Sequence, residues 1–237
     1  MLKIAHRGDS GNVVENSLAS FRKAIELGAD GIELDVWNCK SGELIVFHDK
    51  FLDRMTTTAG LVYDKTLNEL KQLKLWFKGE ETNQTIPTLQ EVFTLVKESA
   101  KQDFKVLIEL KGCDLEEKVV ELIQCNNFHN SSIVISFRHD RVLKIKELDQ
   151  RIKTGVLLNA VPVNLIKVIE KAQADMLIIS QEFIVLKDIK SVQERGHDVL
   201  IFTVNTQKAI EKMKNKNVDG IISDHPELLI ESVQAVN

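Results

Sequence analysis

Cysteines are few in this sequence, and their spacing argues against two common kinds of stabilising site. The 237 residues include three, Cys39, Cys113 and Cys125, and no two of them form a Cys-x-x-Cys pair. An odd number of cysteines without such a pair is atypical of a disulfide framework or a structural zinc site. We therefore expect reduced thiols, as in cytoplasmic proteins.

Long apolar runs and clustered basic residues are also missing. No stretch of about 18 apolar residues occurs, so we expect no membrane-spanning helix and no stable membrane insertion. A strand pattern begins at Leu2 and leaves no room for a secretory leader, which favours a cytoplasmic protein. The net charge is −4, with lysine and arginine spread along the chain. This distribution argues against a nucleic acid as the main partner, but it permits a small anion held by local cations.

Short apolar runs alternate with amphipathic helical stretches along the whole chain. The predicted strands are Leu2–His6, Gly31–Trp37, Leu44–His48, Lys105–Lys111, Ile133–Phe137, Lys153–Leu158, Met176–Ser180, Val199–Val204 and Gly220–Ser223. Most are nearly continuous Ile, Leu and Val, which is typical of strands buried on both faces of a parallel sheet.

Capping residues and apolar spacing locate the helices between these strands. Asn16 is predicted to cap a helix that runs to about Leu27 and stops at Gly28. The other predicted helices are Leu89–Ala100, Leu115–Gln124, Asp140–Leu148, Val163–Ala172, Lys187–Arg195, Gln207–Asn215 and Glu227–Val236. The alternation of strand and helix indicates an α/β fold.

The connection after the second strand decides the fold type. Only residues 38–43 separate Trp37 from Leu44, too few for a parallel crossover, so these strands form a hairpin. Setting aside the return strand leaves eight β–α units, the number in a closed (β/α)8 TIM barrel. A doubly wound sheet is the alternative, but no glycine-rich dinucleotide-binding loop follows the first strand.

One long stretch, about residues 50–87, does not fit the alternation. It contains a short helical piece near Leu67–Leu73 and a polar loop at Lys78–Thr85. Long loops in compact domains commonly cover functional sites. We predict a small insertion over the C-terminal mouth of the barrel, within a single domain that spans residues 1–237.

Acidic residues interrupt two of the buried strands. Glu33 and Asp35 are two residues apart, so on a strand they point to the same face. Adjacent carboxylates repel each other unless a proton or a cation lies between them, and Glu109 adds a third acid. Three such ligands suit Mg²⁺ or Ca²⁺. Alone, the pair Glu33 and Asp35 also fits a strand that faces water.

Basic and titratable residues follow the same strand ends. His6 and Arg7 follow the first strand, His48 follows the hairpin, and Lys111 follows Glu109. Arginine grips phosphate with its planar fork, lysine adds a point charge, and two histidines can exchange protons near neutral pH. A single histidine at a strand end is commonly a surface residue, so the joint occurrence is what indicates a metal-assisted site for a phosphate ester.

The remaining histidines are weaker candidates. His129, His139 and His197 lie in polar or charged turns. His225 follows the last strand, so it lies at the mouth and is a candidate for contact with the site. The alternative is that this segment only starts a helix, with Asp224 as its N-cap. Nothing beside Cys113 marks an activated thiol.

Several short motifs in a fixed order resemble the glycerophosphodiester phosphodiesterase family across essentially the whole chain. They are His6-Arg7-Gly8, Glu15-Asn16, Glu33-Leu34-Asp35-Val36, His48-Asp49, Ile86-Pro87-Thr88-Leu89, Glu109-Leu110-Lys111, Ser136-Phe137, Thr203-Val204-Asn205 and Asp219-Gly220-Ile221-Ile222-Ser223-Asp224. The resemblance implies a TIM barrel that hydrolyses glycerophosphodiesters to glycerol 3-phosphate and an alcohol such as choline or ethanolamine.

The resemblance also implies roles for individual residues. Glu33, Asp35 and Glu109 are similar to the family's metal ligands, His6 and His48 to its acid–base pair, and Arg7, Lys111 and Glu15 to its substrate-binding residues. Asn16 has only a helix cap as its implied role. The family pattern leaves open whether a glycerol hydroxyl attacks phosphorus to form a cyclic phosphate or water attacks directly.

Three departures from the family pattern accompany the resemblance. Ser17 replaces the usual Thr, Ser41-Gly42 replaces Asp-Gly in the hairpin turn, and Phe202 stands where Trp is common.

Two alternative functions stay open. One is a lysophospholipase D, for which Leu75-Trp76-Phe77 would contact the acyl chain, and the other is a barrel that binds phosphodiesters without cleaving them.

Overall fold

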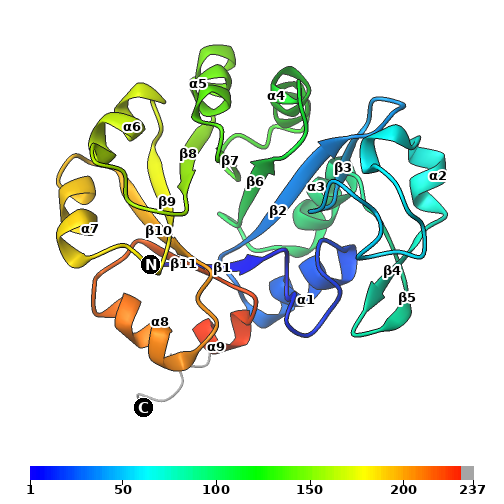
Figure 1. Cartoon of the computed structure of the whole chain (residues 1–237), viewed down its shortest axis with the longest axis horizontal. Coiled ribbons are helices and arrows are strands. Elements are labelled where there is room, and N and C mark those ends of the chain that lie inside the picture. Colours follow the sequence, from blue (N-terminus) through cyan, green and yellow to red (C-terminus); the bar gives the residue numbers. More distant parts are fainter. Residues whose placement is uncertain (231–237) are drawn as a thin grey trace.

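A computed structural model describes residues 1–230, and its central feature is a closed ring of strands (Figure 1). The strands are β1 (Leu2–His6), β2 (Gly31–Asn38), β3 (Leu44–Val46), β4 (Lys74–Phe77), β5 (Glu80–Thr85), β6 (Lys105–Leu110), β7 (Ser132–Ser136), β8 (Lys153–Leu158), β9 (Met176–Ser180), β10 (Asp198–Phe202) and β11 (Gly220–Ser223). Eight of them run parallel in the order β1-β11-β10-β9-β8-β7-β6-β2, and β1 pairs with β2 to close the ring. The predicted TIM barrel is confirmed, and so is the hairpin, because β3 pairs antiparallel with β2.

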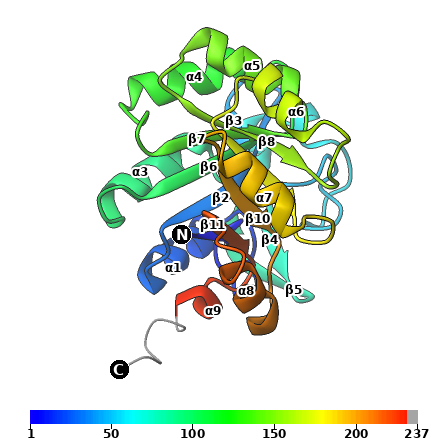
Figure 2. The same ribbon diagram turned by 90° about the vertical axis from the view of Figure 1, so that its left-hand side faces the viewer.

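Helices surround the ring, as the two views show (Figures 1 and 2). They are α1 (Leu18–Leu27), α2 (Leu67–Lys71), α3 (Leu89–Ser99), α4 (Glu116–Cys125), α5 (His139–Leu148), α6 (Leu165–Lys171), α7 (Leu186–Gln193), α8 (Gln207–Lys214) and α9 (Pro226–Ile230), with a 3₁₀ turn η1 (Val62–Asp64). The predicted last helix, Glu227–Val236, is described only to Ile230, and the rest lies outside the described residues. Within residues 1–230 no helix is long and apolar enough to cross a bilayer.

The start of α1 differs from the prediction. Ser17, not Asn16, is the N-cap: its hydroxyl accepts a hydrogen bond from the Ser20 amide, and the Ser20 hydroxyl accepts one from the Ser17 amide. Gly28 ends the helix as predicted, with φ at 88°, a left-handed conformation that glycine adopts without steric cost. The shift of one residue frees the Asn16 side chain for a different contact.

The inside of the barrel is apolar except at one end. Strand residues that alternate inward form one buried cluster: Ile4, Leu107, Ile133, Ile135, Leu157, Met176, Ile178, Leu200 and Ile222. Gly155 makes room for it, since a Cβ there would lie 2.8 Å from Met176 and 2.9 Å from Ile178. Layers of such side chains fill TIM barrels, so this interior is a packed core and the chemistry is confined to the mouth.

The insertion is more ordered than the sequence indicates. Residues predicted as the polar loop Lys78–Thr85 instead include β5, which pairs antiparallel with β4. The insertion and the β2–β3 hairpin share a small apolar core that includes Phe47, Leu52 and Leu75. Because Leu75 is buried there and Trp76 and Phe77 are half-buried, this segment offers little apolar surface to an acyl chain.

Candidate active site

The predicted site residues converge at the carboxyl ends of β1, β2, β3 and β6. Register brings them together: His6 of β1 is paired with Glu33 of β2, and Asp35 of β2 is paired with Glu109 of β6. They open on a cavity of about 190 Å³ that is lined by His6, Arg7, Glu33, His48, Glu109 and Lys111, with Phe137, Leu157 and Phe202 on its apolar side. Asp35 lies beneath this cavity, in contact with Arg7 and Lys111.

Three carboxylates form the floor of the site. Glu33, Asp35 and Glu109 are 3%, 1% and 8% exposed, and one oxygen from each lies within 4.8 Å of the others. Oδ1 of Asp35 is buried without a hydrogen bond, although Nζ of Lys111 lies 3.3 Å away. Buried carboxylate oxygens at this spacing are the ligands that a hard divalent cation prefers. The donor set therefore fits one such ion.

Burial and mutual repulsion shift the pKa values of these acids. Burial, together with the charge of Asp35, raises the pKa of Glu33 to about 8. The same two causes raise the pKa of Glu109. Burial would also raise the pKa of Asp35, but the charges of Arg7 and Lys111 lower it. Asp35 is thus readily ionised, whereas ionisation of Glu33 and Glu109 is disfavoured. A bound cation would offset the repulsion among the three charges.

Two cationic side chains border the carboxylates. The Arg7 guanidinium donates a hydrogen bond of 2.9 Å to Glu15, and its Nε lies 3.3 Å from Oδ2 of Asp35. Nζ of Lys111 lies 2.8 Å from Oε1 of Glu109. Glu15 therefore fixes Arg7 at the mouth. Both cations reach the space above the acids, where an anionic ligand would be held.

The first histidine is oriented by a residue from the other end of the chain. Nδ1 of His6 lies 2.6 Å from Oδ1 of Asp224, which also accepts a hydrogen bond of 3.1 Å from Ser10. Nε2 of the same ring faces Glu33 at 3.8 Å. Burial would lower the pKa of His6, but the hydrogen bond to Asp224 and the charge of Glu33 raise it.

The second histidine has a matching partner of its own. Nδ1 of His48 lies 2.6 Å from Oδ1 of Asp49. Burial lowers the pKa of His48, and the charges of Arg7 and Lys111 lower it further against the opposing effect of Asp35. An aspartate on Nδ1 fixes the tautomer and leaves Nε2 for proton transfer.

Arg54 of the insertion joins the two sides of the site. Its Nε donates to Asp49, and its two terminal nitrogens donate to Glu15 at 3.0 Å and 2.7 Å. One arginine therefore holds both the partner of His48 and the partner of Arg7. No pattern in the sequence marks Arg54, because its partner Glu15 is 39 residues away and only the fold brings the two side chains together.

Two predicted roles need correction, and the weaker candidates lie elsewhere. Asn16 does not cap α1; its side-chain amide donates a hydrogen bond of 2.8 Å to Oδ2 of Asp35. Asp224, for which a helix cap was the alternative interpretation, turns its carboxylate to His6, and the same carboxylate accepts a hydrogen bond of 2.5 Å from Asn205. The remaining histidines, His129, His139, His197 and His225, do not line the cavity, and the exposed Cys113 lies outside it.

Comparison with known proteins decides the family. Residues 6–228 match the model of the glycerophosphoryl diester phosphodiesterase family. The chain belongs to this family. A glycerophosphodiester phosphodiesterase from Caldanaerobacter subterraneus is 39% identical over 98% of both chains, and one from Bacillus altitudinis is 38% identical over 96% of both.

Solved structures agree with this assignment. A phosphodiesterase from Oleispira antarctica, solved in complex with the product sn-glycerol-3-phosphate, superposes with a TM-score of 0.89 at 31% identity, covering 98% of this chain and 96% of that one. A glycerophosphodiester phosphodiesterase from Thermotoga maritima gives a TM-score of 0.81 at 29% identity over 98% of both chains. The predicted enzyme class, a phosphodiesterase of glycerophosphodiesters, is confirmed.

Proposed function

We propose that this phosphodiesterase hydrolyses a glycerophosphodiester to glycerol 3-phosphate and a free alcohol, assisted by one Mg²⁺ or Ca²⁺ ion. The observation that supports it best is the cluster of three buried carboxylates with two histidines beside it. In each histidine, Nδ1 lies 2.6 Å from an aspartate oxygen. The glycerol 3-phosphate bound to the Oleispira antarctica relative supports the identity of the product.

Each residue type has a task in this reaction. Glu33, Asp35 and Glu109 hold the cation, which when bound offsets negative charge on the phosphoryl oxygens. Arg7 and Lys111 bind the same oxygens from above.

The free cysteines within residues 1–230 further support a cytoplasmic enzyme, where thiols stay reduced.

Proton transfer falls to His6 and His48. One imidazole takes the proton from the attacking hydroxyl at Nε2, and the other donates a proton to the alcohol oxygen as the phosphorus–oxygen bond breaks. Asp224 and Asp49 keep the two rings oriented during these steps. The attacking hydroxyl belongs either to the glycerol, which gives a cyclic phosphate that water then opens, or to water directly.

Replacement of each histidine by alanine tests this assignment. We expect His6→Ala and His48→Ala to release glycerol 3-phosphate from glycerophosphocholine at least about 1,000-fold more slowly than the unaltered enzyme, with an unchanged circular dichroism spectrum. A normal rate in either variant would remove that histidine from the mechanism.

A single turnover in ¹⁸O-labelled water distinguishes attack by the glycerol hydroxyl from direct attack by water. Accumulation of a cyclic phosphate supports attack by the glycerol hydroxyl. Label in the product phosphate with no cyclic species supports direct attack by water.

A further inference from the structure

A second cavity lies directly beside the active site. It has a volume of about 600 Å³ and is lined by Trp37, Lys40, Lys50, Tyr63, Lys111 and Asp114, among others. Lys111 lines both cavities, so one lysine forms the boundary between them. Trp37 ties the second cavity to the acid–base machinery, because its indole Nε1 donates a hydrogen bond of 3.3 Å to the backbone oxygen of His48.

The arrangement matches the two arms of a phosphodiester. On one side of Lys111 the active-site cavity has an apolar wall that includes Phe137, Leu157 and Phe202, suited to the carbon atoms of one arm. On the other side the second cavity is open to solvent at Lys40 and Lys50. A phosphate held at Lys111 therefore has room for one substituent in each direction.

The second cavity has a distinct chemical character. Two exposed lysines, Lys40 and Lys50, line it together with a single acid, Asp114. Lys111 also lines it, but its ammonium is already paired with Asp35 and Glu109. The rings of Trp37 and Tyr63 lie 5.9 Å apart along its wall, and the ammonium of Lys50 lies 5.9 Å from the centre of the Tyr63 ring. This ammonium already occupies the aromatic face that a quaternary ammonium would otherwise use. The excess positive charge disfavours a cationic group and favours an anionic one.

We infer that the second cavity binds the leaving alcohol and selects alcohols that carry an additional anionic group, such as a second phosphate. The inference rests on the proposed function, because a leaving alcohol exists only if the diester is cleaved here. Lys40 and Lys50 act as specificity-determining residues: they contact the added anionic group, while Lys111 grips the phosphate that reacts.

Two substrates that differ by one phosphate on the alcohol test this inference. They are glycerophospho-myo-inositol 4-phosphate and glycerophospho-myo-inositol. We expect kcat/KM to be about five- to tenfold higher for the phosphorylated substrate, the gain that two exposed lysine–phosphate pairs supply, and we expect added salt to reduce this ratio. In the double variant Lys40→Gln/Lys50→Gln the ratio falls to about one. Both side chains are exposed, so the variant is expected to fold.

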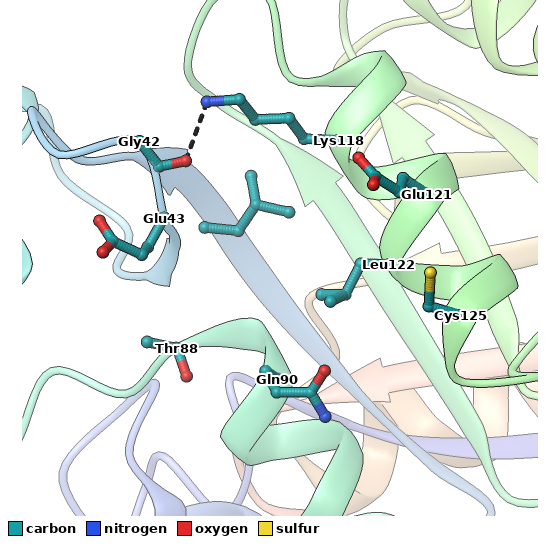
Figure 3. A pocket seen from close by; sticks show the side chains of 9 residues that line it. Gly42, Glu43, Thr88, Gln90, Lys118, Glu121, Leu122 and Cys125 are labelled. Atoms are coloured by element: carbon teal, nitrogen blue, oxygen red, sulfur yellow. Dashed lines mark hydrogen bonds between the residues drawn. The ribbon is translucent and has the colours of Figure 1, made fainter.

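Lys118 provides a matched control on the other side of the hairpin. It lines a separate cavity of about 560 Å³ between the hairpin, α3 and α4, and its Nζ donates a hydrogen bond of 2.8 Å to the Gly42 oxygen (Figure 3). Lys118→Gln removes one lysine charge near the same hairpin but outside the second cavity. The substrate ratio is expected to match that of the unaltered enzyme.

The outcomes separate this inference from the proposed function. A ratio near one in the unaltered enzyme, or a ratio that Lys40→Gln/Lys50→Gln leaves unchanged, overturns the second cavity as an anion-selective site while hydrolysis stands. If neither substrate is hydrolysed, the proposed function fails. In that case, dissociation constants of the same two compounds, measured by calorimetry, test the anion selectivity of the second cavity separately. Equal values overturn the selectivity. Tighter binding of the phosphorylated compound, lost in the double variant, supports it.

Discussion

Nδ1 of His6 lies 2.6 Å from the carboxylate of Asp224, although 218 residues separate them in the chain. The pairing of β1 with β11 brings them together, because Ala5 lies beside Ser223 in that register. Burial opposes ionisation of Asp224, but the hydrogen bonds from His6 and Asn205 lower its pKa to about 2. A permanent negative charge thus fixes the ring of His6, as the charge of Asp49 does for His48.

Asp224→Asn tests this relationship. Asparagine keeps the shape but not the charge, so the favoured tautomer and orientation of His6 are lost. We expect kcat to fall about 100-fold, with KM changed little. Asp140→Asn is the control, because Asp140 pairs with Arg138 on the exposed surface. A kcat within about twofold of the unaltered enzyme would show that Asp224 does not orient His6.

Arg54→Ala tests the link across the mouth. Without Arg54, the carboxylates of Glu15 and Asp49 lose their common partner, so Arg7 and His48 are both held less firmly. Loss of such supporting contacts typically costs about 10- to 100-fold in activity, and we expect kcat/KM to fall by this amount.

Arg138→Ala removes an exposed arginine that also pairs with an acid, and kcat/KM should not change. Equal activities of the two variants would mean that Arg54 is only a surface residue.

The raised pKa of Glu33 predicts how stability depends on pH when no cation is bound. The pKa is about 8 in the folded protein, against about 4.3 in an unfolded chain. The folded protein therefore holds a proton that the unfolded chain has released, and the free energy of unfolding falls as pH rises from about 4.5 to about 8. A bound cation replaces this proton, so added Ca²⁺ or Mg²⁺ stabilises the protein most near the upper end of this range.

Thermal melts in EDTA and in excess cation, at pH values of about 5, 6.5 and 8, measure the effect. Glu33→Gln is neutral throughout and should weaken the pH dependence seen in EDTA, while the raised pKa of Glu109 preserves part of it. A melting temperature that is flat or rises with pH in EDTA would contradict the raised pKa.

A buried ion pair outside the mouth predicts an effect on stability alone. Nε of Arg141 donates to Glu116, and the two side chains are 6% and 10% exposed. Glu116→Gln leaves the arginine charge buried without a counter-ion, so we expect unfolding by urea to show a loss of about 3 kcal/mol. Asp140→Asn breaks an exposed pair and should cost at most about 1 kcal/mol. Similar losses of unfolding free energy in both variants would show that burial does not make the Arg141–Glu116 pair more important than the exposed pair.

Local patterns in the sequence were sufficient to predict the barrel and the floor of the site. The near-continuous apolar runs reflect strands buried on both faces, and the short link before Leu44 admits only a hairpin. Glu33, Asp35 and Glu109 were identifiable because acids inside such strands need a partner. Each of these signals depends on neighbouring residues.

The supporting residues could not be predicted in the same way. Arg54 and Asp224 act on partners 39 and 218 residues away, and only the folded register shows those pairings. The strand β5 was missed because Glu80–Thr85 is polar throughout and has no buried residue. The cap of α1 was misplaced by one residue, because Asn16 and Ser17 are both good caps and only the structure shows that Asn16 is engaged by Asp35.

Titration of Mg²⁺ or Ca²⁺ into the EDTA-treated enzyme, with glycerol 3-phosphate release from glycerophosphocholine followed throughout, shows whether hydrolysis depends on a cation held by the three carboxylates. We expect no release in EDTA, full recovery when one ion is bound per chain, and no recovery in the Glu109→Gln variant. Undiminished release in EDTA, from protein shown to be free of bound metal, would contradict a mechanism assisted by a cation at Glu33, Asp35 and Glu109.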